Sequence, residues 1–143
     1  MTGVRPEEMF MGKYLQIQVR AWTYDEEELL KAWPCLTSLA WSEYDARNAP
    51  TAKHGVMDLA ENLPDILRFG EFPQDVKALM IADAEKAYSL ANALSRALAD
   101  WQPREANRIS EDLESVLTGI EEKLAFERRG GANDAFWERI SEK

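Results

Sequence analysis

The sequence predicts a mainly α-helical fold, a helical bundle that contains a long antiparallel helix hairpin and one N-terminal β-strand. Three patterns support this prediction. Apolar residues recur every three or four positions along most of the chain after residue 24, as in helices packed on a core. Two long segments of this kind, about 73–101 and 103–128, meet almost without a loop. Residues 13–23 instead alternate as a half-buried strand does.

The length and composition indicate one folded domain. The chain has 143 residues, of which 45% are hydrophobic and 10% aromatic, enough to bury a single core. Residues 1–12 contain two glycines, one proline and no periodic pattern. We therefore expect a flexible tail over residues 1–12, followed by one mostly helical domain over residues 13–143.

The predicted strand has one aliphatic face and one polar and aromatic face. The aliphatic face holds Leu15, Ile17, Val19 and Ala21, and the opposite face holds Tyr14, Gln16, Gln18, Arg20 and Trp22. The backbone groups of a strand need a neighbour. Three partners could meet this need: residues 36–41, the N-terminal tail in a hairpin, or the same strand of a second copy. We favour the second copy, because residues 36–41 fit a helix better and the tail has no strand pattern.

Three shorter helices are expected before the hairpin. Thr23 and Glu26 form a capping-box pattern ahead of a helix over about 24–33. Residues 35–47 fit either a strand at 36–41 or a helix that begins at Pro34, and the apolar spacing favours the helix. The next helix, over residues 56–69, contains Pro64, which is expected to kink or split it.

Two heptad registers compete along the first helix of the hairpin. One places Asp83 in the buried seam, where an unpaired carboxylate would be strongly destabilising. The other leaves Asp83 at the edge and is the register that we predict, with Met80, Ala84, Ala87, Ala91, Leu94, Leu98 and Trp101 in the seam. Its alanines allow the second helix to approach closely. Gly119 in that second helix is interpreted as a close-contact point.

A last short helix is expected after Asn133, which can cap it. This helix carries Phe136, Trp137 and Ile140, and three bulky apolar side chains on so short a helix require burial. Two hypotheses satisfy this requirement. The helix docks on the core of its own chain, or it occupies a groove on a partner protein.

The charge and the cysteine content restrict the class of partner and the compartment. Seventeen Lys and Arg residues stand against 26 Asp and Glu residues, and the resulting net charge of -9 repels phosphate backbones and anionic membranes. Nucleic-acid and membrane partners are therefore disfavoured. The acidity is interpreted first as a source of solubility, and the alternative is a surface that binds a protein with a basic surface. The one cysteine excludes an intrachain disulfide, and neither a membrane span nor a secretory signal is visible. We expect a cytoplasmic protein.

The residues that could carry chemistry are few. The sequence has no glycine-rich phosphate loop, no nucleophile elbow and one histidine, so we expect neither a cofactor nor a metal. Cys35 has no neighbouring base in the sequence and is interpreted as a buried structural thiol. The carboxylates of Asp58, Glu61 and Asp65 share one face of a helix, which we interpret as a solvated face.

Arg47 and His54 are the weak candidates for catalytic residues. They are separated by six residues in the segment RNAPTAKH. This spacing resembles the short signature of HEPN-type ribonucleases, a family of small helical dimers. The resemblance covers eight residues and implies that the Arg and His pair would act on an RNA phosphate.

The sequence favours a non-catalytic function. The leading hypothesis is a small acidic protein–protein interaction module, an adaptor, inhibitor or subunit, which acts as a homodimer. The residues expected to mediate the interaction are Tyr14, Gln16, Gln18, Arg20, Trp22, Phe136, Trp137 and Ile140. The second hypothesis is an acidic nucleic-acid mimic or immunity-type inhibitor, which would gather its carboxylates into stripes. A HEPN-like ribonuclease ranks third.

Overall fold

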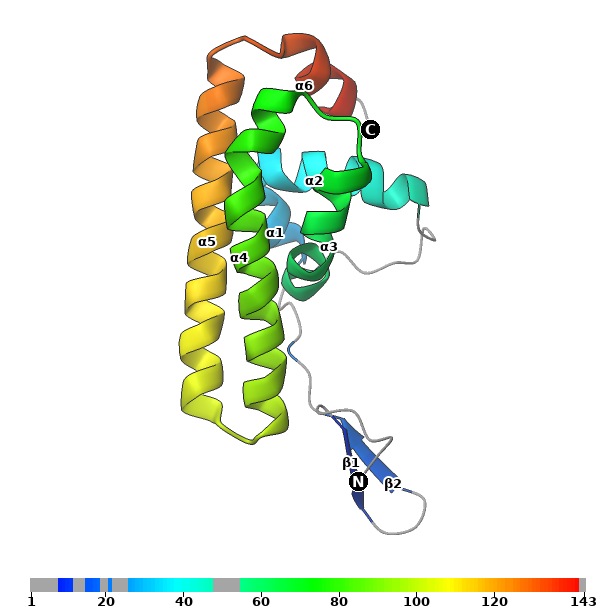
Figure 1. Ribbon diagram of the computed structural model, residues 1–143, viewed down its shortest axis with the longest axis vertical. Helices are drawn as coiled ribbons and strands as arrows, with labels where there is room; N and C mark the ends of the chain where they lie inside the picture. The colour runs from blue at the N-terminus through cyan, green and yellow to red at the C-terminus, as the bar shows by residue number, and fades with distance from the viewer. Residues whose placement is uncertain (1–7, 12–14, 19–20, 22–25, 48–54, 142–143) are drawn as a thin grey trace.

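The structure of the chain, a computed structural model, describes residues 8–11, 15–18, 21, 26–47 and 55–141, with side chains for residues 21, 27–41 and 55–140 (Figure 1). Most of this part is helical, as the sequence predicts. Its helices are α1 (Glu26–Ala32), α2 (Pro34–Arg47), α3 (Val56–Phe69), α4 (Gln74–Ala99), α5 (Pro103–Arg129) and α6 (Asp134–Ser141). Residues 36–41 are helical, so the helix prediction for this segment is confirmed. Pro64 lies inside α3 without splitting it.

The two longest helices, α4 and α5, form the predicted antiparallel hairpin and make the long axis of the molecule (Figure 1). Residues 100–102 connect them. In this turn the backbone N–H of Gln102 donates to the carbonyl oxygen of Ala97, 2.9 Å away. On the hairpin surface, the Nζ of Lys123 lies 2.6 Å from the Oδ2 of Asp83. The carboxylate of Asp83 therefore lies at the edge of the hairpin, where the sequence places it.

The predicted seam of α4 is confirmed from Met80 to Leu94, whereas Leu98 is only half-buried. The buried residues of α4 are Val76, Met80, Ala84, Ala87, Ala91, Leu94 and Ala97. Trp101, however, is 58% exposed, so its placement in the seam is wrong. The physical reason is local, because the φ angle of 57° at Trp101 lies in the left-handed region and takes the residue out of the helical path.

The interpretation of Gly119 as a close-contact point is also wrong. A Cβ atom built on Gly119 has no atom of another side chain or element within 4 Å. The residue lies in the middle of α5 and beside open space. Gly119 therefore weakens the helix without bringing two backbones together.

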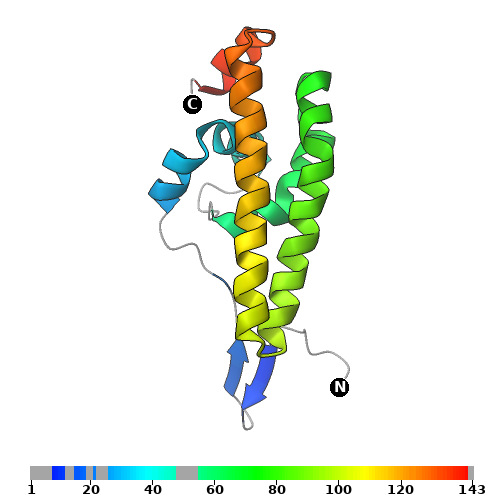
Figure 2. The same ribbon diagram turned by 90° about the vertical axis from the view of Figure 1, so that its left-hand side faces the viewer.

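The shorter helices complete the core on one side of the hairpin. Helix α3 packs against α4, and α2 contacts α3, α5 and α6. Figure 2 shows α1 and α2 on one side of α5, whereas α4 forms the opposite edge of the bundle. The core is continuous, and its most buried large side chains are Trp137, Leu36, Leu39, Leu59, Leu63, Ile66, Leu67, Met80, Leu113, Leu117, Ile120 and Leu124.

Two short strands lie before α1, and their pairing differs from the one that we favour from the sequence. Strand β2 (Leu15–Gln18) lies within the range of the expected strand, and it pairs with β1 (Glu8–Met11) in an antiparallel hairpin that places Met9 opposite Ile17. Residues 8–11 belong to the segment expected to be a flexible tail. A strand pattern of only four residues is too short to recognise there, because its alternation cannot be told from chance. One edge of β2 thus pairs with a strand of the same chain, which is the hairpin alternative, and pairing of its other edge with a second copy stays a prediction.

Candidate functional site

The structure separates the predicted site residues into three groups. Tyr14, Arg20, Trp22 and His54 lie outside the described residues. Gln16, Gln18 and Arg47 are described in their backbone alone, the first two in β2 and the third at the end of α2. The strand surface and the Arg47 and His54 pair therefore stay predictions. Phe136, Trp137 and Ile140 belong to the third group, whose side chains are described.

The three apolar side chains of α6 are buried in the core of their own chain, as the first of the two hypotheses for this helix states. The ring of Phe136 lies edge-on to Phe72, with 5.8 Å between the ring centroids. The guanidinium of Arg128 lies 5.7 Å from the centroid of Trp137, at the distance of a cation–π contact. These contacts hold α6 against the turn between α3 and α4 and against the end of α5.

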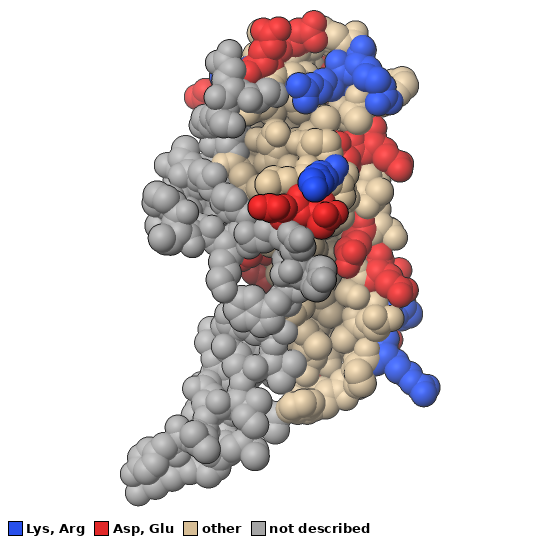
Figure 3. All heavy atoms as spheres, turned by 180° about the vertical axis from the view of Figure 1, so that it is seen from behind, with Lys and Arg blue, Asp and Glu red and all other residues tan. Residues whose placement is uncertain are grey.

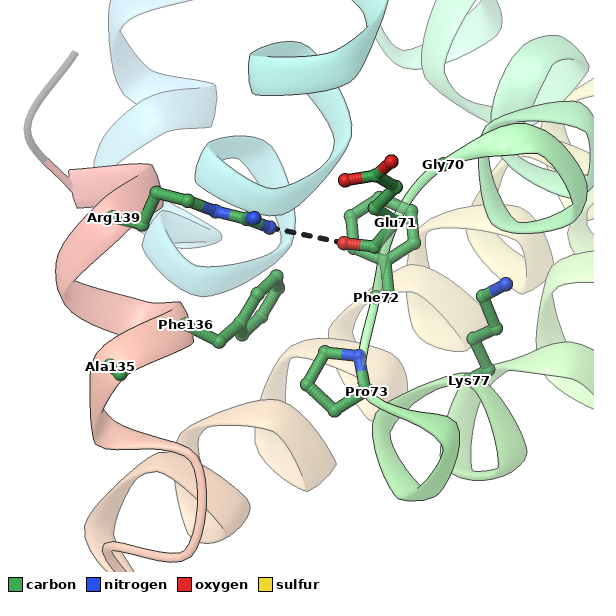
Figure 4. A pocket seen from close by; sticks show the side chains of 8 residues that line it. All are labelled: Gly70, Glu71, Phe72, Pro73, Lys77, Ala135, Phe136 and Arg139. Atoms are coloured by element: carbon green, nitrogen blue, oxygen red, sulfur yellow. Dashed lines mark hydrogen bonds between the residues drawn. The ribbon is translucent and has the colours of Figure 1, made fainter.

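A cleft of about 590 Å³ lies between α6 and the turn that joins α3 to α4. Figure 4 shows its lining, which consists of Gly70, Glu71, Phe72, Pro73, Lys77, Ala135, Phe136 and Arg139. The guanidinium of Arg139 extends from α6 toward the turn, where its Nη2 donates to the backbone carbonyl oxygen of Glu71 at 3.0 Å. The same guanidinium lies 5.5 Å from the centroid of Phe136.

The chemistry of this cleft is an apolar wall with two cations. Phe72, Pro73 and Phe136 supply the apolar surface, and Lys77 and Arg139 supply positive charge. Glu71 adds a carboxylate to the same lining, so the cleft carries charges of both signs and does not select the charge of a ligand. Arg139 is already bonded to the backbone of the turn, so its first role is to join α6 to the rest of the fold.

A buried carboxylate that the sequence analysis missed lies on α5. Glu121 is 7% exposed, and its two carboxylate oxygens accept hydrogen bonds from the first turn of α2. The backbone N–H of Leu36 donates to Oε1 at 2.7 Å, and the N–H of Cys35 donates to Oε2 at 3.2 Å. These N–H groups have no acceptor within their own helix, and a carboxylate near a helix N-terminus is also favoured by the helix dipole.

The sequence contained one signal for Glu121. It directly follows Ile120 and lies four residues after Leu117, both of which are buried in the stripe of α5. A charged residue at that position is adjacent to the core, whereas Glu122 is exposed. This position in the sequence indicates that the Glu121 carboxylate is close to the core. It does not indicate that the carboxylate accepts hydrogen bonds from α2, because the donors are about 85 residues away in the chain.

Cys35 is 5% exposed and is a structural part of this cluster. Burial raises the pKa of its thiol, and the negative charge of Glu121 raises the pKa further, whereas Arg128 acts in the opposite direction. A thiol whose pKa is raised is mostly protonated at neutral pH and is a poor nucleophile. The geometry thus agrees with the interpretation of Cys35 as a buried structural thiol.

The carboxylates of α3 have local partners. Asp58 accepts a hydrogen bond from the backbone N–H of Gly55 at 3.2 Å and so caps the start of the helix. Asp65 lies 3.8 Å from the guanidinium of Arg68, one turn later. Among the residues that the structure describes, His, Cys, Asp and Glu side chains do not gather in threes as a metal site requires.

The surface carries both charges and large apolar side chains. On the face shown in Figure 3, the described part carries both basic and acidic residues. Six large apolar side chains of the described part are exposed: Leu30, Phe69, Ile81, Tyr88, Trp101 and Phe126. Four of the six are aromatic.

Comparison with known proteins identifies no relative, because no protein-family model, curated protein or solved structure matches this chain. Of the helices that the structure describes, none has the length and apolar content needed to cross a membrane.

Proposed function

We propose that the chain is a non-catalytic protein–protein interaction module, an adaptor, inhibitor or subunit that acts by binding other protein chains and forms a homodimer. The observation that supports this proposal is the set of exposed aromatic residues on the helices. Phe126 on α5 is 75% exposed, and Phe69 at the end of α3 is also exposed. Aromatic side chains dominate binding hot spots, because they bury a large area with few rotatable bonds.

The charge of the chain supports a partner with a basic surface. A net charge of -9 attracts a positively charged protein and increases the rate at which the two meet. Basic as well as acidic residues lie on the face in Figure 3. Their presence supports a contact with another protein more than imitation of a nucleic acid, which needs acidic residues alone. The partner is therefore proposed to be a protein that combines an apolar pocket with a basic rim.

Affinity capture with the tagged full chain in its native cell tests this proposal. We expect a stoichiometric partner to be retained by the wild type and by Glu122→Ser, a substitution at an exposed polar position of α5. A variant with Phe69→Ser and Phe126→Ser should bind the purified partner about tenfold or more weakly, as for the loss of hot-spot residues. Equal binding by all three chains, or capture of no stoichiometric partner, would contradict the proposal.

A further inference from the structure

The outer face of α4 lies opposite its buried seam, and two large apolar side chains lie along the border between this face and the seam. Ile81 and Tyr88 lie one heptad apart there and are 43% and 44% exposed. Ala78 and Ala82 are exposed on the same side of the helix. Figure 2 shows α4 at the edge of the bundle, on the side away from α1 and α2. Large apolar side chains at heptad spacing on a second face of a helix ordinarily pack on a second neighbour.

One acidic and one basic side chain lie on this face. A twofold axis halfway between them would place the acidic side chain of one copy beside the basic side chain of the other. Glu85 and Arg96 are exposed and lie on the same side of α4, eleven residues apart in the chain. At 1.5 Å per residue this is about 16 Å along the helix. In an antiparallel pair of α4 helices, Glu85 of each copy lies level with Arg96 of the partner subunit. A parallel pair would instead bring like charges together, which is unfavourable.

Two polar side chains between these charges fit the same arrangement. Ser89 and Asn92 are both exposed on the outer face, and their midpoint along α4 is also the midpoint of Glu85 and Arg96. In the antiparallel pair, Ser89 of each copy therefore lies level with Asn92 of the partner subunit. The hydroxyl and the amide can each donate and accept a hydrogen bond. An asparagine within a helix pair also specifies the register, because a shifted register leaves it without its partner.

The side chains beside the proposed axis, Ser89 and Tyr88, also suit this register. Ser89 is small enough to let two helix axes approach toward the short end of the usual distance of about 8 to 10 Å. Tyr88 lies beside the crossing, where its ring can cover the polar centre. Ile81 is level with Asp100 of the partner subunit and one residue from the level of the partner subunit's Ala99. Charge and hydrogen bonding thus favour one register, and the apolar side chains do not by themselves select it.

We infer that the outer face of α4 is a homodimer contact, in which two copies of this chain pack antiparallel about an axis midway between Ser89 and Asn92. The inference rests on the proposed function and deepens it, because it names a second copy as one of the chains bound and α4 as the surface. The 26 residues of α4 span about 39 Å, a length that allows an extended helix pair. The contact is self-complementary, as a twofold interface must be.

Sedimentation velocity of the full chain across a concentration series tests the contact. The wild type is expected to form a species of twice the 16.3 kDa monomer mass. Asn92→Glu places the carboxylates of both copies near the axis and should shift the chain to the monomer. Ser115→Glu introduces the same charge at an exposed polar position of α5 and should leave the dimer intact. Glutamate is a good helix former, and circular dichroism of both variants checks that the helices are retained.

Charge reversal tests the antiparallel orientation. Glu85→Arg or Arg96→Glu alone should weaken the dimer about tenfold, because each places like charges together at both ends of the pair. The double variant should restore the affinity. A wild type that is monomeric throughout, equal effects of the two glutamate variants, or a double reversal as weak as the single ones would overturn the inference. Capture of another protein through Phe69 and Phe126 is measured separately, so failure here does not decide the proposed function.

Discussion

At the scale of single residues, Glu121 connects two parts of the chain that are distant in sequence. Its carboxylate accepts two backbone N–H groups at the start of α2, from a position on α5. A side chain from a remote helix thus does the work of an N-cap, which an adjacent Ser, Thr or Asp ordinarily does. The first turn of α2 begins with Pro34, whose missing N–H leaves fewer donors to satisfy.

Replacement of Glu121 tests this contact. Glu121→Leu leaves the N–H groups of Cys35 and Leu36 without their acceptor, and we expect a loss of about 3 kcal/mol in the free energy of unfolding. Glu121→Gln keeps one carbonyl oxygen as an acceptor and should lose about half of that. Urea denaturation measures both, with Glu122→Gln on the exposed neighbour as the control. Equal stability of Glu121→Leu and the wild type would show that these hydrogen bonds contribute nothing.

The thiol of Cys35 predicts a pH dependence in the alkaline range. Its pKa is raised above the ordinary value of 9.0, first by burial and then by the charge of Glu121. The folded state therefore holds this proton more tightly than the unfolded state. The resulting stability is fully present below pH 9.0 and is lost as the pH rises through the pKa of the folded state.

Denaturation of the wild type and of Cys35→Ala at several pH values checks this prediction. The free energy of unfolding of the wild type should fall more steeply above pH 9.0 than that of Cys35→Ala. Other groups titrate in both chains, so the difference between the two profiles isolates the thiol. Parallel profiles would mean that the thiol has the same pKa in the folded and unfolded states.

At the scale of elements, α5 contains a glycine that its surroundings do not require. Gly119 lies in the helix interior beside open space, so a methyl group there meets no neighbour. Gly119→Ala should raise the free energy of unfolding by about 0.5 to 1 kcal/mol, because alanine loses less backbone entropy in a helix. Thermal or urea denaturation measures the change.

Gly70 provides the contrasting control at the end of α3. A Cβ there would lie 2.7 Å from the carbonyl oxygen of Ile66, closer than real Cβ atoms come to backbone. Gly70→Ala should therefore destabilise the chain while Gly119→Ala stabilises it. If both substitutions shift the stability in the same direction, the packing described around at least one of these glycines is wrong.

At the scale of the whole molecule, α6 joins the C-terminal end of the chain to the helices before it. Trp137 is among the most buried large side chains, and Phe136 contacts the turn between α3 and α4 through Phe72. Within the described residues, the indole Nε1 of Trp137 is buried and has no hydrogen-bond acceptor. The stabilisation from Trp137 therefore comes from its apolar area and its contact with Arg128.

Substitution of Trp137 tests how α6 docks. Trp137→Ala should lower the free energy of unfolding by about 3 to 5 kcal/mol, the range for removal of a large core aromatic residue. Trp137→Phe keeps much of the apolar area and removes the buried N–H, so it should be much less destabilising. Urea denaturation followed by circular dichroism measures both. A chain that tolerates Trp137→Ala without loss would show that α6 is not part of the cooperative fold.

The amino-acid sequence by itself determined the positions of the helices and most of the buried stripe on α4. The spacing of apolar residues repeats along a helix, so bounds such as 56–69 can be read locally and agree with α3. Tertiary structure decided what depends on contacts distant in sequence: the acceptor role of Glu121, the burial of α6 and the pairing of β2 with β1. The spacing of apolar residues indicates whether a segment is a helix or a strand, because this spacing is local in the sequence. The partner of a side chain or a strand depends on segments that come together only when the chain folds.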